Sequence, residues 1–155
     1  MSLLRMAVLG TPEVFHDGTR LTFALRKAQA LLHYLAVEGG LHPRSKLAAL
    51  LWPDSEPADA RKGLRNALAL LRDLLADAGT LSAQNGHLIS EHDLLGLDPQ
   101  VPLELDLDVV QQAYAQVQRL STIPSEPQRS VLVAQGEHAL TLVRGPFLDG
   151  FWLRE

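Results

Sequence analysis

The segment KLAALLW at residues 46–52 runs into a turn, PDSEP at residues 53–57, and then into ADARKGLRNALALLRDLLADA at residues 58–78. Leucine recurs in the last segment at steps of three and four residues, which predicts a helix from Ala58 to Ala78. At about 100° per residue, the leucines that lie within about 40° of Leu64 are Leu68, Leu71 and Leu75. They predict an apolar stripe that packs against a core.

The same helix carries its basic side chains on a second face. These polar residues, about 60° to 200° from Leu64, are Arg61, Lys62, Arg65, Asn66 and Arg72. A short apolar helix, a turn and then a basic helix are typical of proteins that read the DNA major groove. Arginine suits bidentate pairing with guanine, and asparagine suits adenine. A solvated charged face is the alternative interpretation.

The composition limits the class of protein. The chain has 155 residues, 46% of them apolar, which is enough for one ordinary domain or for one small domain and part of another. It contains no cysteine, which excludes disulfides and thiolate chemistry. No apolar run approaches the roughly 20 residues of a membrane span, and the first residues do not form a secretory signal. We expect a soluble cytoplasmic protein.

Charge is distributed unevenly along the chain, whose net charge is −4. Residues 1–79 contain ten Lys and Arg against eight Asp and Glu, whereas residues 80–155 contain four against ten. This asymmetry suggests two tasks, with any contact to a polyanion in the first half. Chance variation is the alternative explanation.

The N-terminal region alternates short apolar runs with turns. The runs Leu4–Leu9, Val14–His16 and Leu21–Phe23, with a turn at Asp17-Gly18, predict a small antiparallel sheet. Apolar residues then recur with helical spacing from Arg26 to Glu38, and two glycines end this helix.

The next two helices begin at recognisable signals. Pro43 suits the first position of a helix that ends at Trp52. Asp54 or Ser55 is expected to cap the basic helix. We expect Trp52 to lie in the core, and Gly63 to allow close helix packing, since it lies away from the basic face.

A β-hairpin is predicted directly after the basic helix. Leu81–Ala83 and His87–Ser90 flank Asn85-Gly86, and Asn-Gly is the strongest short hairpin signal. Three helices with a sheet before them and a hairpin after them predict an α+β winged helix-turn-helix over residues 1–98.

Residues 103–155 differ in character from the preceding part. A helical stripe contains Leu107, Val110, Ala113, Tyr114, Val117 and Leu120. After a loop at Ser121–Pro127, a second helix is predicted from Gln128 to Val143, which makes an αα-hairpin of the helical-repeat type. Glutamines 111, 112, 116 and 118 are expected on its solvated face. Because Phe147–Leu153 is apolar with nothing left to bury it, we expect a longer native protein.

Five motifs resemble the N-terminal part of the Streptomyces antibiotic regulatory protein (SARP) type of bacterial transcription activators. They are RKAQALLHYLA at 26–36, LAALLWPD at 47–54, ARKGLRNALALLR at 60–72, LDLD at 105–108 and VRGPFLDGF at 143–151. The resemblance implies an OmpR-type winged helix that binds direct repeats in promoter DNA, followed by the start of a TPR-like bacterial transcriptional activator domain. It further implies RNA polymerase as a partner, through its sigma or alpha subunit, and allows a homodimer on DNA.

Six further residues are candidates for DNA contact. Arg44, Ser45 and Lys46 open the second helix, whose N-terminus can hold a phosphate, although ordinary capping polarity explains them too. Arg26 and Lys27 also stand at a helix start, where a phosphate or a structural salt bridge would offset the helix dipole. His87 is the polar residue that the predicted wing offers.

Enzyme motifs are absent from the sequence. It contains no G-x-x-x-x-G-K-[ST], H-E-x-x-H or G-x-S-x-G pattern. Glu91, His92 and Asp93 are adjacent in the chain and would diverge in a strand, so we expect no metal and no cofactor. The alternative to a DNA-binding activator is a protein-interaction module that uses the winged-helix and TPR-like surfaces, suggested by Leu70 and the acidic second half.

Overall fold

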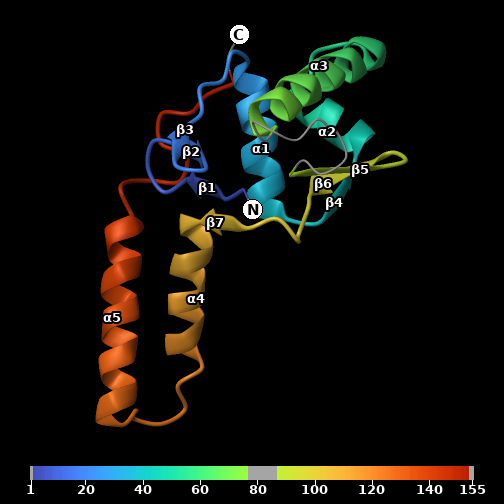
Figure 1. Ribbon diagram of the computed structural model, residues 1–155. Helices are drawn as coiled ribbons and strands as arrows, with labels where there is room; N and C mark the ends of the chain where they lie inside the picture. The colour runs from blue at the N-terminus through green and yellow to red at the C-terminus, as the bar shows by residue number, and fades with distance from the viewer. Residues whose placement is uncertain (1, 77–86, 154–155) are drawn as a thin grey trace.

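The computed structural model describes residues 2–76 and 87–153. It has a head of two small sheets and three helices, from which a long helical hairpin projects (Figure 1). The predicted α+β class, with an N-terminal sheet, a helical core, a wing and a helical hairpin, is confirmed.

The N-terminal sheet has four strands in the order β3-β2-β1-β7. The strands are β1 (Leu4–Ala7), β2 (Glu13–His16), β3 (Thr19–Arg20) and β7 (Leu103–Leu105). The third strand was predicted at Leu21–Phe23, but the tight turn at Asp17-Gly18 starts the pairing at Thr19. Sequence patterns did not predict β7, which pairs in parallel with β1 from far along the chain.

Three helices form the middle of the head: α1 (Arg26–Glu38), α2 (Arg44–Leu51) and α3 (Pro57–Leu75). The bounds of α1 are as predicted. Pro43 does not open α2, because it belongs to strand β4 (Leu41–Pro43) and precedes the helix in extended conformation. Glu56, and not Asp54 or Ser55, is the residue before α3, and Pro57 occupies its first turn.

The predicted apolar stripe of α3 faces the core. Leu64, Leu68, Leu71 and Leu75 are buried, together with leucines of α1 and α2. Trp52 packs against this core and lies over Gly63, where an added Cβ would be 2.6 Å from Trp52 Cε2. Gly63 therefore permits close packing, as predicted. Leu70, in contrast, is half-buried.

The structure describes a wing whose turn lies further along the chain than the predicted hairpin. Strands β4, β5 (Leu88–Glu91) and β6 (Leu94–Leu97) form a sheet in the order β4-β6-β5, and the hairpin turns at His92-Asp93. The hairpin predicted at Asn85-Gly86 lies outside the described residues. Gly96 allows β4 to approach β6, because an added Cβ would be 2.4 Å from the Gly40 carbonyl oxygen.

The helical hairpin consists of α4 (Asp106–Gln118) and α5 (Glu126–Leu142). The second helix starts before the predicted Gln128, because Ser125 and Gln128 form a capping box that places Glu126 in the first turn. Most side chains of the two helices are exposed or half-buried. None of the described helices is long and apolar enough to cross a membrane.

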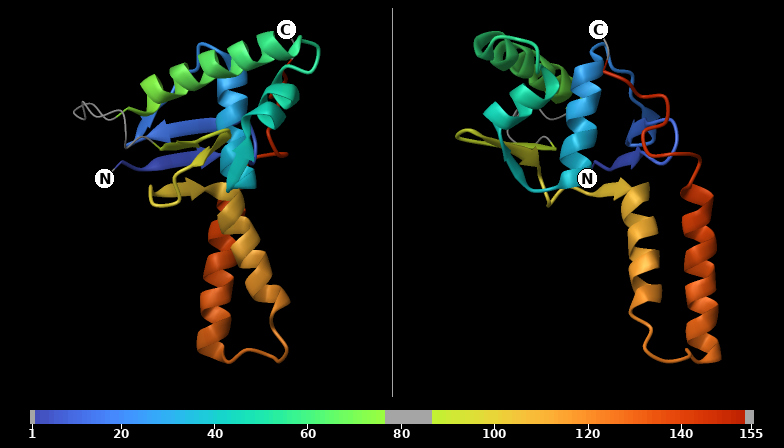
Figure 2. Two further views of the ribbon diagram at one scale, coloured as in Figure 1. Left: turned by 90° about the vertical axis from the view of Figure 1, so that its right-hand side faces the viewer. Right: turned by 180° about the vertical axis from the view of Figure 1, so that it is seen from behind.

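Two connections join the hairpin to the head. The buried carboxylate of Asp106 accepts hydrogen bonds from the backbone N–H groups of Val8 at 2.9 Å, Leu9 at 2.9 Å and Leu107 at 2.8 Å. After α5, the return segment (residues 144–152) runs back along the head to α1 (Figures 1 and 2). Residues 8–10, which follow β1, the start of α4 and the return segment thus form one hydrogen-bonded junction.

The expectation that Phe147–Leu153 has nothing to bury it is wrong, because part of the return segment packs against the head. Leu148 donates its N–H to the Val8 carbonyl at 2.7 Å, and both Leu148 and Phe151 pack against the core of the head. Phe147 and Trp152 stay largely exposed. Burial of this segment was unpredictable from local pattern, since its partners lie more than a hundred residues earlier.

Candidate nucleic-acid interface

The basic face of α3 is exposed. The side chains of Arg61, Lys62, Arg65, Asn66 and Arg72 all lie in solvent, on the helix surface opposite the buried leucines. Among the described residues, none of the five side chains forms a hydrogen bond or an ion pair, although Asp59 and Asp73 share the helix. Four cations are therefore available to an external anion.

Spacing along the helix divides this face. At about 1.5 Å rise per residue, Arg61 and Asn66 lie about 8 Å apart along the axis, whereas Arg72 is a further 9 Å or so away. The first cluster is therefore short enough for one stretch of a major groove, whereas Arg72 stands apart from it. The packing of Trp52 on Gly63 holds this part of α3 against the turn that precedes it.

Arg44, at the start of α2, lies beside the wing. Its guanidinium group donates a hydrogen bond to the Ser90 hydroxyl of β5, and its backbone N–H donates to the Asp93 carbonyl at 2.8 Å. Arg44 therefore ties α2 to the wing. Ser90 was not predicted as part of this region, since only the observed strand register brings it near α2.

The neighbours of Arg44 are more accessible. Ser45 and Lys46 are both exposed at the start of α2, and the Lys46 ammonium lies 6.0 Å from the centre of the Tyr34 ring. Their position beside the first N–H groups of α2 suits the binding of a phosphate.

Arg26 and Lys27 are engaged in contacts within the protein. Arg26 donates a hydrogen bond to the Trp152 carbonyl at 3.0 Å and lies 5.5 Å from the centre of the Phe151 ring. The Lys27 ammonium lies 5.2 Å from the Trp52 ring. The alternatives left open for Arg26 were a phosphate and a structural salt bridge. Among the described residues, its contacts are a hydrogen bond to a carbonyl and a ring contact within the protein, not a salt bridge.

His87 does not project from the wing, contrary to its prediction as a DNA contact. It is only 3% exposed and precedes β5; its ring lies 5.0 Å from the His16 ring in an edge-to-face arrangement. The exposed end of the wing carries Glu91, His92 and Asp93 instead. Its two carboxylates would repel phosphates, so the wing offers little to a DNA backbone.

Comparisons by sequence identify no relatives: no family model and no curated protein matches the chain. By structure, the chain is similar to Mycobacterium tuberculosis EmbR, solved in complex with a low-affinity phosphopeptide. The TM-score is 0.68 at 22% identity, and the match covers 97% of this chain and 38% of EmbR. At this identity the match shows a common fold. The chain spans well under half the length of EmbR.

Proposed function

We propose that this chain is the DNA-reading part of a SARP-type transcription activator, with α3 lying in the major groove of direct repeats in promoter DNA. The observation that carries the proposal is the exposed cluster on α3, in which four cations and an amide have no partner among the described residues. The fold shared with EmbR, a regulator of the SARP family, supports it.

The residues of the cluster take different tasks. Arg65 and Asn66, in the middle of the exposed face, are assigned to base edges, since arginine pairs with guanine and asparagine with adenine. Arg61, Lys62 and Arg72 are assigned to phosphates, together with Ser45 and Lys46 at the start of α2. Arg44 contributes indirectly by holding the wing against α2.

We assign activation to the second part of the fold. The hydrogen-bonded junction through Asp106 would hold the α4–α5 hairpin in a defined direction from the bound promoter. We propose that the activator domain which begins there helps to recruit RNA polymerase through its sigma or alpha subunit, with two copies of the protein on adjacent repeats.

The test begins with a binding site selected from a pool of random duplexes, followed by fluorescence anisotropy on that site and on a scrambled duplex. Arg65→Ala should weaken binding to the selected site by about 1–3 kcal/mol and reduce discrimination. Lys46→Ala should weaken both duplexes alike and lower the salt dependence by about one counterion.

Arg119→Ala serves as the matched control, because Arg119 is also exposed but lies at the end of α4, far from α3. It should leave both affinities unchanged. Binding that is insensitive to salt, or that all three variants weaken equally, would contradict the proposed interface.

A second candidate function is a protein-interaction module that does not bind DNA. The acidic end of the wing and the exposed apolar side chains of Tyr114, Ile123 and Leu140 favour it. It predicts self-association or binding to polymerase subunits together with no shift of any promoter fragment in a gel assay.

A further inference from the structure

We infer that a cavity beside α1 is a binding site for a small, uncharged, largely apolar molecule that carries a hydroxyl group. The cavity has a volume of about 400 Å³ and lies over one face of α1, between α2 and the return segment. The right-hand view of Figure 2 shows α1 with these two segments on either side. The side chains that line the cavity come from these three segments and from adjacent Leu153, so the site is separate from the proposed DNA interface on α3.

The lining of the cavity is largely apolar and partly buried. Ala30 of α1 and Leu51 of α2 are only 9% and 4% exposed. Leu50 forms a more exposed part of the α2 wall, and Phe147 and Phe151 add aromatic rings from the return segment. A dry apolar cavity of roughly 150 Å³ is enough to bind benzene. The cavity beside α1 is larger and accommodates a ring with a short alkyl chain.

A buried polar side chain, His33, belongs to this apolar lining. His33 is only 2% exposed, and its ring packs edge-to-face on Phe151 with 5.7 Å between the ring centres. Among the described residues, neither Nδ1 nor Nε2 of His33 has a hydrogen-bond partner. Buried polar atoms are almost always hydrogen-bonded, so this exception calls for an explanation. A molecule bound in the cavity would supply the missing partner.

The protonation state of His33 indicates which polar group the bound molecule needs. Burial lowers the pKa of His33 to about 4, partly offset by the Asp106 carboxylate, so the ring is neutral near pH 7. A neutral imidazole has one N–H donor and one nitrogen acceptor. A hydroxyl group both donates and accepts, and it therefore suits whichever nitrogen it meets. An alkyl group satisfies neither nitrogen.

The charge of the lining argues against an ionised ligand. Among the described residues that line the cavity there is no Lys or Arg, and the one charged side chain is that of exposed Glu38. A carboxylate would meet Glu38 without any cation to compensate for its lost hydration. Any ion placed at His33 would also be desolvated among apolar side chains. A neutral hydroxyl group is therefore the better match.

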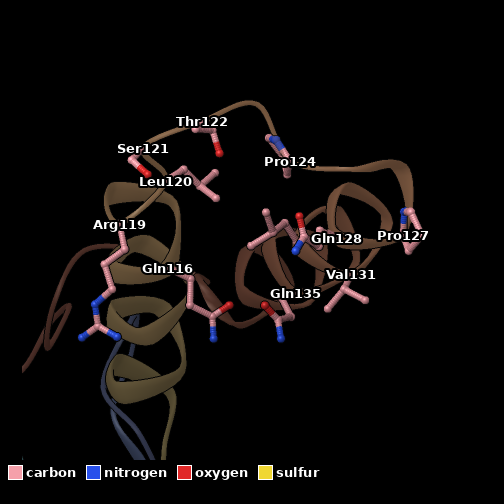
Figure 3. A pocket seen from close by; sticks show the side chains of 11 residues that line it. Gln116, Arg119, Leu120, Ser121, Thr122, Pro124, Pro127, Gln128, Val131 and Gln135 are labelled. Atoms are coloured by element: carbon pink, nitrogen blue, oxygen red, sulfur yellow. The ribbon is translucent and has the colours of Figure 1, made fainter.

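A wider opening at the far end of the hairpin does not share these features (Figure 3). Gln116 and Gln135 at its rim are exposed, as predicted for Gln116, and the Arg119 guanidinium group points away from the opening. None of its described lining residues is buried. Exposed amides are hydrated by solvent and need no ligand. The buried, unpartnered ring of His33 distinguishes the cavity beside α1.

The experiment uses the whole chain and three probes that share a propylphenyl body: para-propylphenol, propylbenzene and para-propylbenzoate. NMR titrations at pH 7 follow the backbone signals of Val37 and Leu51 and the ring nitrogen signals of His33. Para-propylphenol should bind about fivefold or more tightly than propylbenzene, because it adds a hydrogen bond to a buried partner. It should also shift the His33 ring signals. Para-propylbenzoate should not bind.

Three variants identify the site. His33→Leu replaces the ring by an apolar side chain and should bind para-propylphenol and propylbenzene about equally. Leu50→Trp places a larger side chain in the α2 wall and should weaken both by about tenfold or more. Because Leu50 is 49% exposed, this variant tests the site even if His33→Leu does not fold. Leu140→Trp, at an exposed leucine of α5, is the matched control and should bind as the natural chain does.

Four results would overturn the inference. They are no binding of para-propylphenol, equal binding of para-propylphenol and propylbenzene to the natural chain, unchanged His33 ring signals while para-propylphenol binds, and equal effects of the two tryptophan variants. Binding is measured without DNA, so failure of this site is distinguishable from failure of the α3 interface.

Discussion

The head and the α4–α5 hairpin contain helices with the same kind of amphipathic pattern, yet they bury it to different extents. Helix α3 has six buried residues, whereas α4 has only Asp106 and α5 only Ala139 among the described residues. In the head, α1 and α2 cover the leucines of α3, but the hairpin has only its two helices to pack together. An apolar stripe therefore predicts that a helix forms. Whether the stripe is buried depends on whether other helices or strands of the fold cover it.

Substitution of Asp106, at the junction between the head and the hairpin, should cause the largest loss of stability. Asp106→Ala would leave three backbone N–H groups without their acceptor, two of them in the chain after β1. Each buried donor without a partner costs about 1–3 kcal/mol, so we expect a loss of about 3–4 kcal/mol in the free energy of unfolding measured with urea.

Two variants define the cause of that loss. Asp106→Asn retains one acceptor oxygen and should lose less stability than Asp106→Ala. Asp108→Ala, an exposed carboxylate in the same turn of α4, should change little. If Asp108→Ala cost as much as Asp106→Ala, helix-dipole effects and not the junction would be responsible.

A pH effect on stability is expected from His33 of α1, which lies beneath the return segment. Burial lowers the pKa of His33 to about 4, partly offset by the nearby Asp106 carboxylate. Between pH 6.5 and about 4, His33 binds a proton more readily in the unfolded chain than in the folded protein. The stability that neutral, buried His33 permits is therefore complete above pH 6.5 and is lost as the pH falls. We expect the loss to reach about 2–3 kcal/mol.

The measurement compares urea unfolding of the natural chain and of His33→Leu from pH 7 to pH 4.5. The difference between the two proteins isolates His33 from the carboxylates that titrate at lower pH. Parallel curves over this range would show that His33 does not titrate on unfolding as expected.

Two helical glycines offer the smallest but most closely matched comparison. In α3, Gly63→Ala places a Cβ 2.6 Å from the Trp52 ring, so Trp52 must move. We expect a net loss of about 1–2 kcal/mol from overpacking, although alanine favours helix by about 1 kcal/mol. In α5, Gly136→Ala meets no atom within 4 Å and should stabilise the protein by up to about 1 kcal/mol.

The measurement is the midpoint of thermal unfolding of each variant. A lower midpoint for Gly63→Ala and a higher one for Gly136→Ala would show that the head is closely packed at Trp52 and that the hairpin is open at Gly136. A stabilising effect of Gly63→Ala would show that Trp52 has room to move and does not hold α3 in place.

Local patterns predicted several elements closely. Helix α1 has the predicted bounds, and the leucine spacing identified the buried face of α3. Patterns did not predict pairing between strands that are distant in sequence. Strand β7 pairs with the edge of β1 from nearly a hundred residues away, and β4 pairs with β6, whose hairpin with β5 turns at His92-Asp93.

The candidate site shows the same division. The exposed residues of α3 were predicted from helical periodicity, because exposure on an amphipathic helix follows from the position of its apolar stripe. The contacts of His87 and Arg26 could not be predicted for a common reason: each side chain lies against a partner far along the chain. His87 packs with His16, and Arg26 binds the Trp152 carbonyl.

The sequence by itself determined which segments are helical, which face of each helix is apolar, and that the cations gather on one side of α3. These properties follow from spacing along a single chain segment. Tertiary structure decided which cations remain free, where the wing turns, and how Asp106 and the return segment attach the hairpin to the head. Such features depend on hydrogen bonds and packing between residues that lie roughly a hundred positions or more apart in the chain. No local sequence pattern encodes contacts at that separation.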